Sequence, residues 1–159
     1  MKKILRSTLA LALIGVFAVL FTACSSGGKT PAVSDIVTAI TEKYPMSDAM
    51  IKIDDETTIT NTIGIEKADY TDIAVYVNNS GLDQDEIIIV KATDADAAKR
   101  ITEVLNNQLT GKMNSTKNYL PEQYEIVEKC KVVQEGDYLS LIISPDADAM
   151  NEIFKAQLK

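Results

Sequence analysis

The sequence predicts an α+β fold in which two hairpin–helix repeats form an antiparallel four-stranded sheet with helices packed on it, after one or two N-terminal helices. Three observations predict it. Apolar residues alternate or run together over 73–77, 86–91, 130–133 and 138–143, as in strands. They recur at helical spacing near the N-terminus and over 94–113. The order of strand and then helix occurs twice, 52 residues apart.

A first helix is expected to begin near Ser34, which is a good N-cap residue, and to end before Pro45. Its apolar face would consist of Val33, Ile36, Val37 and Ile40. The acid-rich run 54–56 indicates the first turn of a short second helix, because carboxylates stabilise helix N-termini. Gly64 would end that helix.

Strands are expected at 73–77 and 86–91, joined by the turn residues 78–81. The second of these strands is almost entirely apolar and should be central. A long amphipathic helix over 94–113 and a polar loop at 119–124 come next. A hairpin with its turn at 135–137 then precedes a last helix, with Ser144 as its N-cap.

The internal repeat is clearest at the two helix starts, Thr93-Asp-Ala-Asp-Ala97 and Pro145-Asp-Ala-Asp-Ala149. It predicts that both following helices pack on one face of the sheet. The opposite face would then carry Tyr76, Tyr138 and Ile142. Either the N-terminal helices cover that face, which is our prediction, or it is an interaction surface.

The N-terminus has the three parts of a secretory signal: a basic start, an apolar core and a small-residue site before Cys24. We expect residues 1–23 to be a signal peptide, residues 24–32 a flexible tether and residues 33–159 a single globular domain. The segment Phe21-Thr-Ala-Cys24 resembles the lipobox of bacterial lipoproteins, although Phe21 stands where that pattern usually has Leu. The resemblance implies a lipid on Cys24 and anchoring to the outer face of the cell membrane.

An uncleaved transmembrane anchor is the alternative, because about 20 apolar residues can span a bilayer. Both readings place residues 29–159 outside the cell.

The mature chain also resembles an uncharacterised family of small lipoproteins from clostridia-like Gram-positive bacteria. The shared layout includes the acidic stretch that ends in Gly64-Ile65, the run Ile-Ile-Val-Lys91, the segment Tyr119-Leu-Pro-Glu-Gln-Tyr124, and Ile-Ile-Ser144 before an acidic helix start. This resemblance implies a location and a single fold, but no activity.

Composition excludes several functions. Without the residues before Cys24, the chain has 13 basic and 23 acidic residues, a net charge of −10, which argues against a nucleic-acid partner. The chain has no His, so Ser-His-Asp, Cys-His and zinc chemistry are excluded. We expect no cofactor and no metal. The Asp94/Asp96 and Asp146/Asp148 pairs are interpreted as helix caps, and the cluster 83–86 is the best cation candidate, although a solvated turn is the preferred interpretation.

The function that remains is a non-catalytic binding or interaction module, anchored to the membrane through its lipid and serving an envelope protein partner. The alternative is an envelope hydrolase that uses paired carboxylates. Tyr119 and Tyr124 could form a binding lip or pack over the sheet edge, and they join Tyr76 and Tyr138 as candidate interaction residues. Cys130 is expected to be a buried strand residue rather than a nucleophile.

Overall fold

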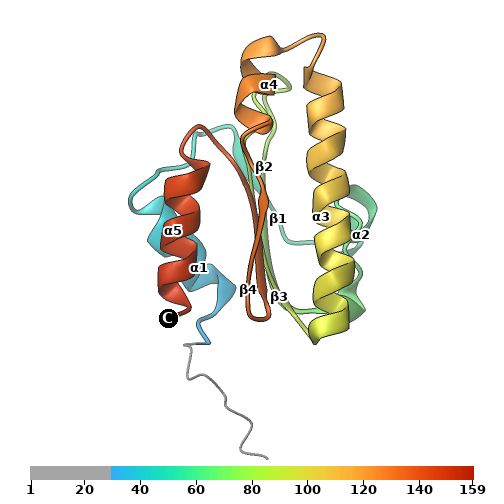
Figure 1. Ribbon diagram of the computed structural model, residues 1–159, viewed down its shortest axis with the longest axis vertical. Helices are drawn as coiled ribbons and strands as arrows, with labels where there is room; N and C mark the ends of the chain where they lie inside the picture. The colour runs from blue at the N-terminus through green and yellow to red at the C-terminus, as the bar shows by residue number, and fades with distance from the viewer. Residues whose placement is uncertain (1–29) are drawn as a thin grey trace, which may run out of the picture.

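A computed structural model describes residues 30–159, which form a five-stranded sheet between two layers of helices (Figure 1). The expected signal peptide, Cys24 and most of the expected tether lie outside the described residues. On one face of the sheet lie α1 (Val33–Thr41) and α5 (Ala147–Gln157), and on the other α2 (Glu56–Thr62) and α3 (Ala95–Thr116). The short helix α4 (Pro121–Val127) caps the upper end in this view, and a 3-10 turn, η1 (Lys67–Asp69), precedes the second strand.

The sheet is antiparallel throughout, with the strand order β1-β2-β3-β5-β4. Its strands are β1 (Met50–Ile53), β2 (Tyr70–Asn78), β3 (Glu86–Ala92), β4 (Val132–Glu135) and β5 (Tyr138–Ile143). The prediction of an α+β fold is confirmed, but the prediction of four strands is wrong because it omitted β1. The apolar run Ile87 to Val90 lies in the central strand and is buried on both faces, as its composition indicated.

The two repeat helices lie on opposite faces of the sheet, so the expected placement on one face is wrong (Figure 1). On the α5 side, Ser140 of β5 shares a hydrogen bond of 2.7 Å with Asn151. On the α3 side, Glu86 of β3 accepts a hydrogen bond of 3.3 Å from Gln108. A two-fold axis between antiparallel neighbours would keep both helices on one face. The 52-residue echo is therefore a repeat of pattern and not of structure.

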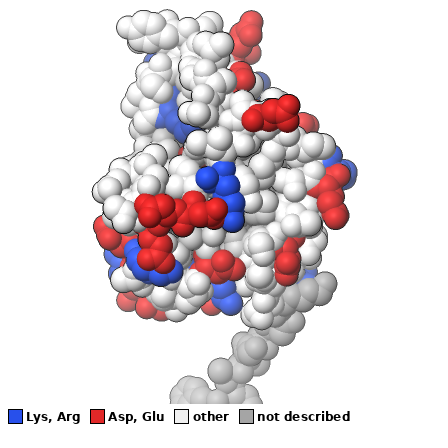
Figure 2. Space-filling model, turned by 180° about the vertical axis from the view of Figure 1, so that it is seen from behind, with Lys and Arg blue, Asp and Glu red and all other residues white. Residues whose placement is uncertain are grey.

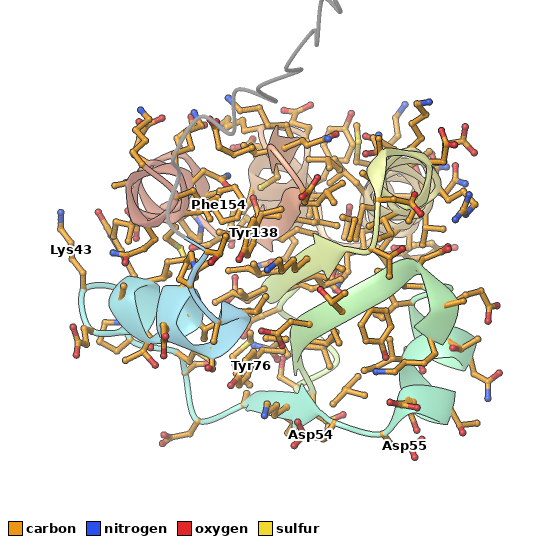
Figure 3. All side chains as sticks on the ribbon, turned by 90° about the horizontal axis from the view of Figure 1, so that it is seen from below. Lys43, Asp54, Asp55, Tyr76, Tyr138 and Phe154 are labelled. Carbon is orange, nitrogen blue, oxygen red and sulfur yellow. The ribbon has the colours of Figure 1, made fainter. Side chains whose placement is uncertain are left out.

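The face that carries Tyr76 and Tyr138 is covered by α1 and α5, so the prediction that the N-terminal helices cover it is right for α1 and wrong for α2, which lies on the other face. Tyr138 is 5% exposed, and its hydroxyl donates a hydrogen bond of 2.7 Å to the Pro31 carbonyl oxygen. In Figure 3, Tyr138 and Phe154 lie in the interior between the helices and the sheet. This contact also fixes the point at which the chain enters the domain, at the lower end in Figure 1.

Helix starts follow the carboxylates, though not always at the expected residue. Asp55 accepts a hydrogen bond of 2.7 Å from the Thr58 amide, and Asp94 caps α3 in the same way. Helix α1 begins one residue before Ser34, because the Asp72 side chain of β2 accepts a hydrogen bond of 2.7 Å from the Val33 amide. Helix α5 begins at Ala147, after a turn in which the Ser144 hydroxyl accepts from the Asp146 amide; the expected cap by Asp146 is wrong, because its side chain makes no capping hydrogen bond.

Candidate functional site

Two large apolar side chains stand exposed together at the upper end of the domain. Tyr119 is 85% exposed and Leu82 is 66% exposed, although they are 37 positions apart in the sequence. Both line one open groove of about 350 Å³ between the β2–β3 loop and the turn from α3 to α4. We call it the distal groove, because it lies at the opposite end of the domain from Pro31 (Figure 1). It is lined by Leu82, Asp83, Tyr119, Leu120, Pro121, Glu122 and Gln123.

The β2–β3 side of the groove is held by hydrogen bonds within the loop. The side-chain oxygen of Asn78 accepts a hydrogen bond of 2.8 Å from the Ser80 backbone amide. The Ser80 hydroxyl then accepts from the amides of Leu82 and Asp83, at 3.2 and 3.1 Å. Gly81 supplies the left-handed conformation of the turn, with φ of +77°. Leu82 is therefore presented to solvent by a fixed backbone.

The other side of the groove is a tight turn between two helices. Thr116 is 1% exposed at the end of α3, and its carbonyl oxygen accepts from the amides of Tyr119 and Leu120, at 3.1 and 2.8 Å. Pro121 then occupies the first position of α4, where no helical amide bond is needed. The polar loop expected at 119–124 is thus wrong, because its second half is helical.

Side chains from α3 and α4 join the two sides. The Gln123 side-chain oxygen accepts a hydrogen bond of 3.0 Å from the Gln84 amide. From below, the Lys112 ammonium donates to the Gln84 carbonyl oxygen at 3.3 Å. Both backbone polar groups of Gln84 are therefore hydrogen-bonded to side chains of α3 and α4. These bonds fix the β2–β3 loop and give the groove a defined shape.

Lys112 in turn rests on a buried carboxylate. Glu86 is 0% exposed, and its Oε2 lies 3.6 Å from the Lys112 ammonium. Its other oxygen accepts from the Gln108 amide group at 3.3 Å. Burial raises the pKa of Glu86 above its ordinary value, and the charge of Lys112 opposes that rise. Lys112 thus lies between the buried Glu86 carboxyl group and the Gln84 carbonyl oxygen of the loop.

The acidic cluster 83–86 does not converge on one point. Asp83 borders the distal groove, Asp85 lines a different cleft, and the Glu86 side chain lies beneath α3. Within residues 30–159, no three Asp, Glu or Cys side chains are placed so that they could hold a metal ion. Residues 83–86 therefore do not form a cation site.

The charged residues that line the distal groove are both acidic, Asp83 and Glu122. Seen from behind, the upper end of the molecule is mostly uncharged surface, with acidic side chains along one side and a basic patch below (Figure 2). The groove thus combines an apolar floor with a negative border.

A second cleft, of about 200 Å³, lies between the α1–β1 connection and the start of α5. Its apolar lining includes Met46, Met50 and Met150, and three acidic residues, Asp85, Glu86 and Asp146, line it as well. Burial is the main cause that raises the pKa of Asp85, and the nearby charge of Asp83 adds to it. Lys43 also lines this cleft, and in Figure 3 its side chain extends outward from the end of α1.

Cys130 is 9% exposed, in agreement with the expected buried thiol. It precedes β4 instead of lying in it, and its Sγ is 3.2 Å from the Ile126 carbonyl oxygen. Burial raises the pKa of the thiol, which lowers the fraction of reactive thiolate.

The four tyrosines named from the sequence do not form one surface. Tyr138 is buried, Tyr76 and Tyr124 are half-buried, and Tyr119 is exposed. Repulsion by the charge of Glu128 raises the pKa of Tyr124. Sequence reasoning missed Leu82, the residue that shares the groove with Tyr119. The available signal in the sequence was a Leu directly after Gly81 in an otherwise polar turn.

Comparison with known proteins gives a family but no mechanism. No helix within residues 30–159 is long and apolar enough to cross a membrane. No curated protein and no solved structure matches the chain significantly. Residues 42–144, which include β1 to β5 and the whole distal groove, match DUF4358, a domain of unknown function. The chain therefore belongs to the DUF4358 family.

Proposed function

We propose that this protein is a lipid-anchored, non-catalytic binding module on the outer face of the cell membrane, and that the distal groove contacts its envelope protein partner. The observation that carries the proposal is the joint exposure of Tyr119 and Leu82 on two fixed loops. Exposed apolar side chains gathered in one depression are typical of interaction sites.

The energetics favour a binding role for these two residues over a role in folding. Neither side chain belongs to the buried core of the domain. Covering both on contact with a partner would contribute about 3–5 kcal/mol from apolar burial alone. The groove volume of about 350 Å³ is also within the usual range of binding pockets, about 300–1,000 Å³.

The position of the groove supports the proposed anchoring. The described chain begins at the lower end of the domain, where Pro31 accepts the Tyr138 hydrogen bond. A lipid on Cys24 would hold that end toward the membrane. The distal groove would then face away from the bilayer, where another envelope protein can reach it.

A hydrolase remains the second candidate, because Asp85 and Asp146 line one cleft and the pKa of Asp85 is raised, as in a general acid. Its volume of about 200 Å³ is below the usual pocket range, which disfavours a polymeric envelope substrate. The variant Asp85→Asn with Asp146→Asn tests it. Loss of glycan or peptide hydrolysis by the full chain would support catalysis, and we expect no hydrolysis to lose.

Two measurements in cells test the proposal. A labelled fatty acid should enter the full chain and should not enter the Cys24→Ser variant; equal labelling would contradict the lipid anchor. For the groove, a photo-cross-linking amino acid placed at Asn118, beside Tyr119, should give a discrete adduct with an envelope protein. The matched probe at Asn61, exposed on α2, should give none. Equal adducts at both positions, or none at Asn118, would contradict the binding role of the groove.

A further inference from the structure

The charges around the distal groove identify the chemistry of its occupant. We propose that the partner inserts a cationic, partly apolar polypeptide segment, with Arg or Lys beside an aliphatic side chain. This inference rests on the proposed function of the same groove and adds the class of ligand to it.

Among the described residues, the two carboxylates at the groove have no cationic partner. Within residues 30–159, neither Asp83 nor Glu122 lies within ion-pair distance of a Lys or Arg. Lysines pair with five surface carboxylates, Asp54, Glu56, Asp96, Asp148 and Glu152, while most other carboxylates of residues 30–159 are unpaired, as these two are. The single side-chain contact of Asp83 with Gln123 is long, at 3.5 Å. Both groups therefore retain acceptor capacity for an incoming donor.

An exposed aromatic ring, that of Tyr119, lines the same groove as the two carboxylates. Lysines of this domain lie over tyrosine rings at three places, such as Lys67 over Tyr70 at 4.5 Å. In the part of the chain that the structure describes, no Lys or Arg occupies the face of Tyr119 in this way. An exposed tyrosine face attracts an ammonium or guanidinium group, and attraction grows as water is excluded.

The lining of the groove also favours a polypeptide over other classes of envelope polymer. An anionic polymer would be repelled by Asp83 and Glu122 and by the acidic domain as a whole. A neutral glycan could donate hydroxyl hydrogen bonds to Asp83, Glu122 and Gln123, but it would leave the two negative charges uncompensated. A segment that alternates basic and aliphatic side chains satisfies the carboxylates, the ring and the apolar floor together.

A defined peptide tests this chemistry on the full chain in neutral phosphatidylcholine nanodiscs. The probe is a fluorescein-labelled octapeptide of alternating Arg and Leu, and its affinity is measured by fluorescence anisotropy. Replacing Asp83→Asn with Glu122→Gln should weaken binding about tenfold, the scale of two exposed ion pairs. The control, Glu42→Gln with Glu103→Gln, makes the same change in net charge at exposed positions outside the groove and should leave the affinity nearly unchanged.

The peptide itself supplies two further controls. Exchanging Arg for citrulline, which is neutral, or Leu for Ser should each weaken binding to the unmodified chain. Equal weakening by the groove variant and the charge-matched control would overturn the proposal, because it would show general attraction to an acidic surface. Stronger binding of a neutral glycan oligomer than of the peptide would overturn it as well. If the Asn118 cross-link in cells survives Asp83→Asn with Glu122→Gln, the binding role stands and the cationic partner is refuted.

Discussion

Replacing Glu86 with Gln isolates the pH dependence that one buried carboxylate gives to folding. Gln is nearly isosteric with Glu, carries no charge, and can still accept the hydrogen bond that Gln108 donates to Oε1 at 3.3 Å. The variant therefore removes the cost of burying a charge without emptying a core site. Lys112 keeps its hydrogen bond to the Gln84 carbonyl oxygen.

The sign follows from the direction of the pKa shift. Burial raises the pKa of Glu86 in the folded state above its ordinary value of 4.5, so the folded protein holds this proton more tightly than the unfolded chain. The stabilising contribution of Glu86 is fully present below pH 4.5 and is lost as the pH rises through the folded-state pKa. Within that window, the unfolding free energy falls by about 1.4 kcal/mol for each pH unit.

Urea titrations of the full chain and of Glu86→Gln at pH values from 4 to 8 measure this contribution. The variant should gain stability relative to the unmodified chain as the pH rises, and the difference should level off above the folded-state pKa. Lys112→Met should have the opposite effect at neutral pH, a loss of about 3–5 kcal/mol, because it leaves the buried carboxylate without its cation. A difference between Glu86→Gln and the unmodified chain that does not change with pH would refute the reasoning.

Three further predictions concern the packing of Tyr138, the burial of the Cys130 thiol and the absence of a structural metal or disulfide. Tyr138→Phe should lower the unfolding free energy by about 1 kcal/mol through loss of the Pro31 hydrogen bond, whereas Tyr138→Ser should lower it by about 3–5 kcal/mol; equal losses would contradict the packing of α1 over this face. Alkylation of Cys130 by iodoacetamide at pH 8, followed by mass spectrometry, should be much slower in the folded protein than in urea, and equal rates would contradict its burial. Thermal melts with and without chelator or reductant should coincide, and a large drop with chelator would indicate a metal near Asp83.

Local pattern predicted most helices and the central strands, because burial imposes periodicity on their sequences. The helix over 94–113, the apolar strand at 86–91 and the hairpin before Ser144 are all present. Strand β1 was missed because it has only four residues, and an edge position lets Lys52 remain exposed among them. So short a segment carries too little alternation to be recognised.

The face on which each helix packs could not be predicted from pattern. Both repeat helices follow their strands through similar acidic starts, yet α3 and α5 lie on opposite faces. Every residue of β5 is buried, so its sequence does not distinguish the two faces. The choice is made by the path of the connection and by the packing of α1, which are tertiary properties.

Only one side of the distal groove, the segment 119–124, was named as a candidate interaction site from the sequence. The segment that contains Tyr119 was named from the sequence either as a binding lip or as a cover over the sheet edge, and Leu82 was not connected with it. Their neighbourhood depends on the hydrogen bond between Gln123 and Gln84, which are 39 positions apart. By contrast, the separation of Asp85 from Glu86 was accessible from the sequence, because successive residues at a strand start point to opposite faces.

The central claim is that Tyr119 and Leu82 are kept exposed for a partner and not for the fold. The most direct test replaces both residues with Ser in the full chain. The unfolding free energy is measured on the purified protein, and the cross-link at Asn118 is measured in the cells that produce it. The account predicts that the unfolding free energy changes by less than about 1 kcal/mol, as for exposed positions, while the cross-linked adduct disappears. A loss of several kcal/mol, or an adduct that persists at full intensity, would contradict it.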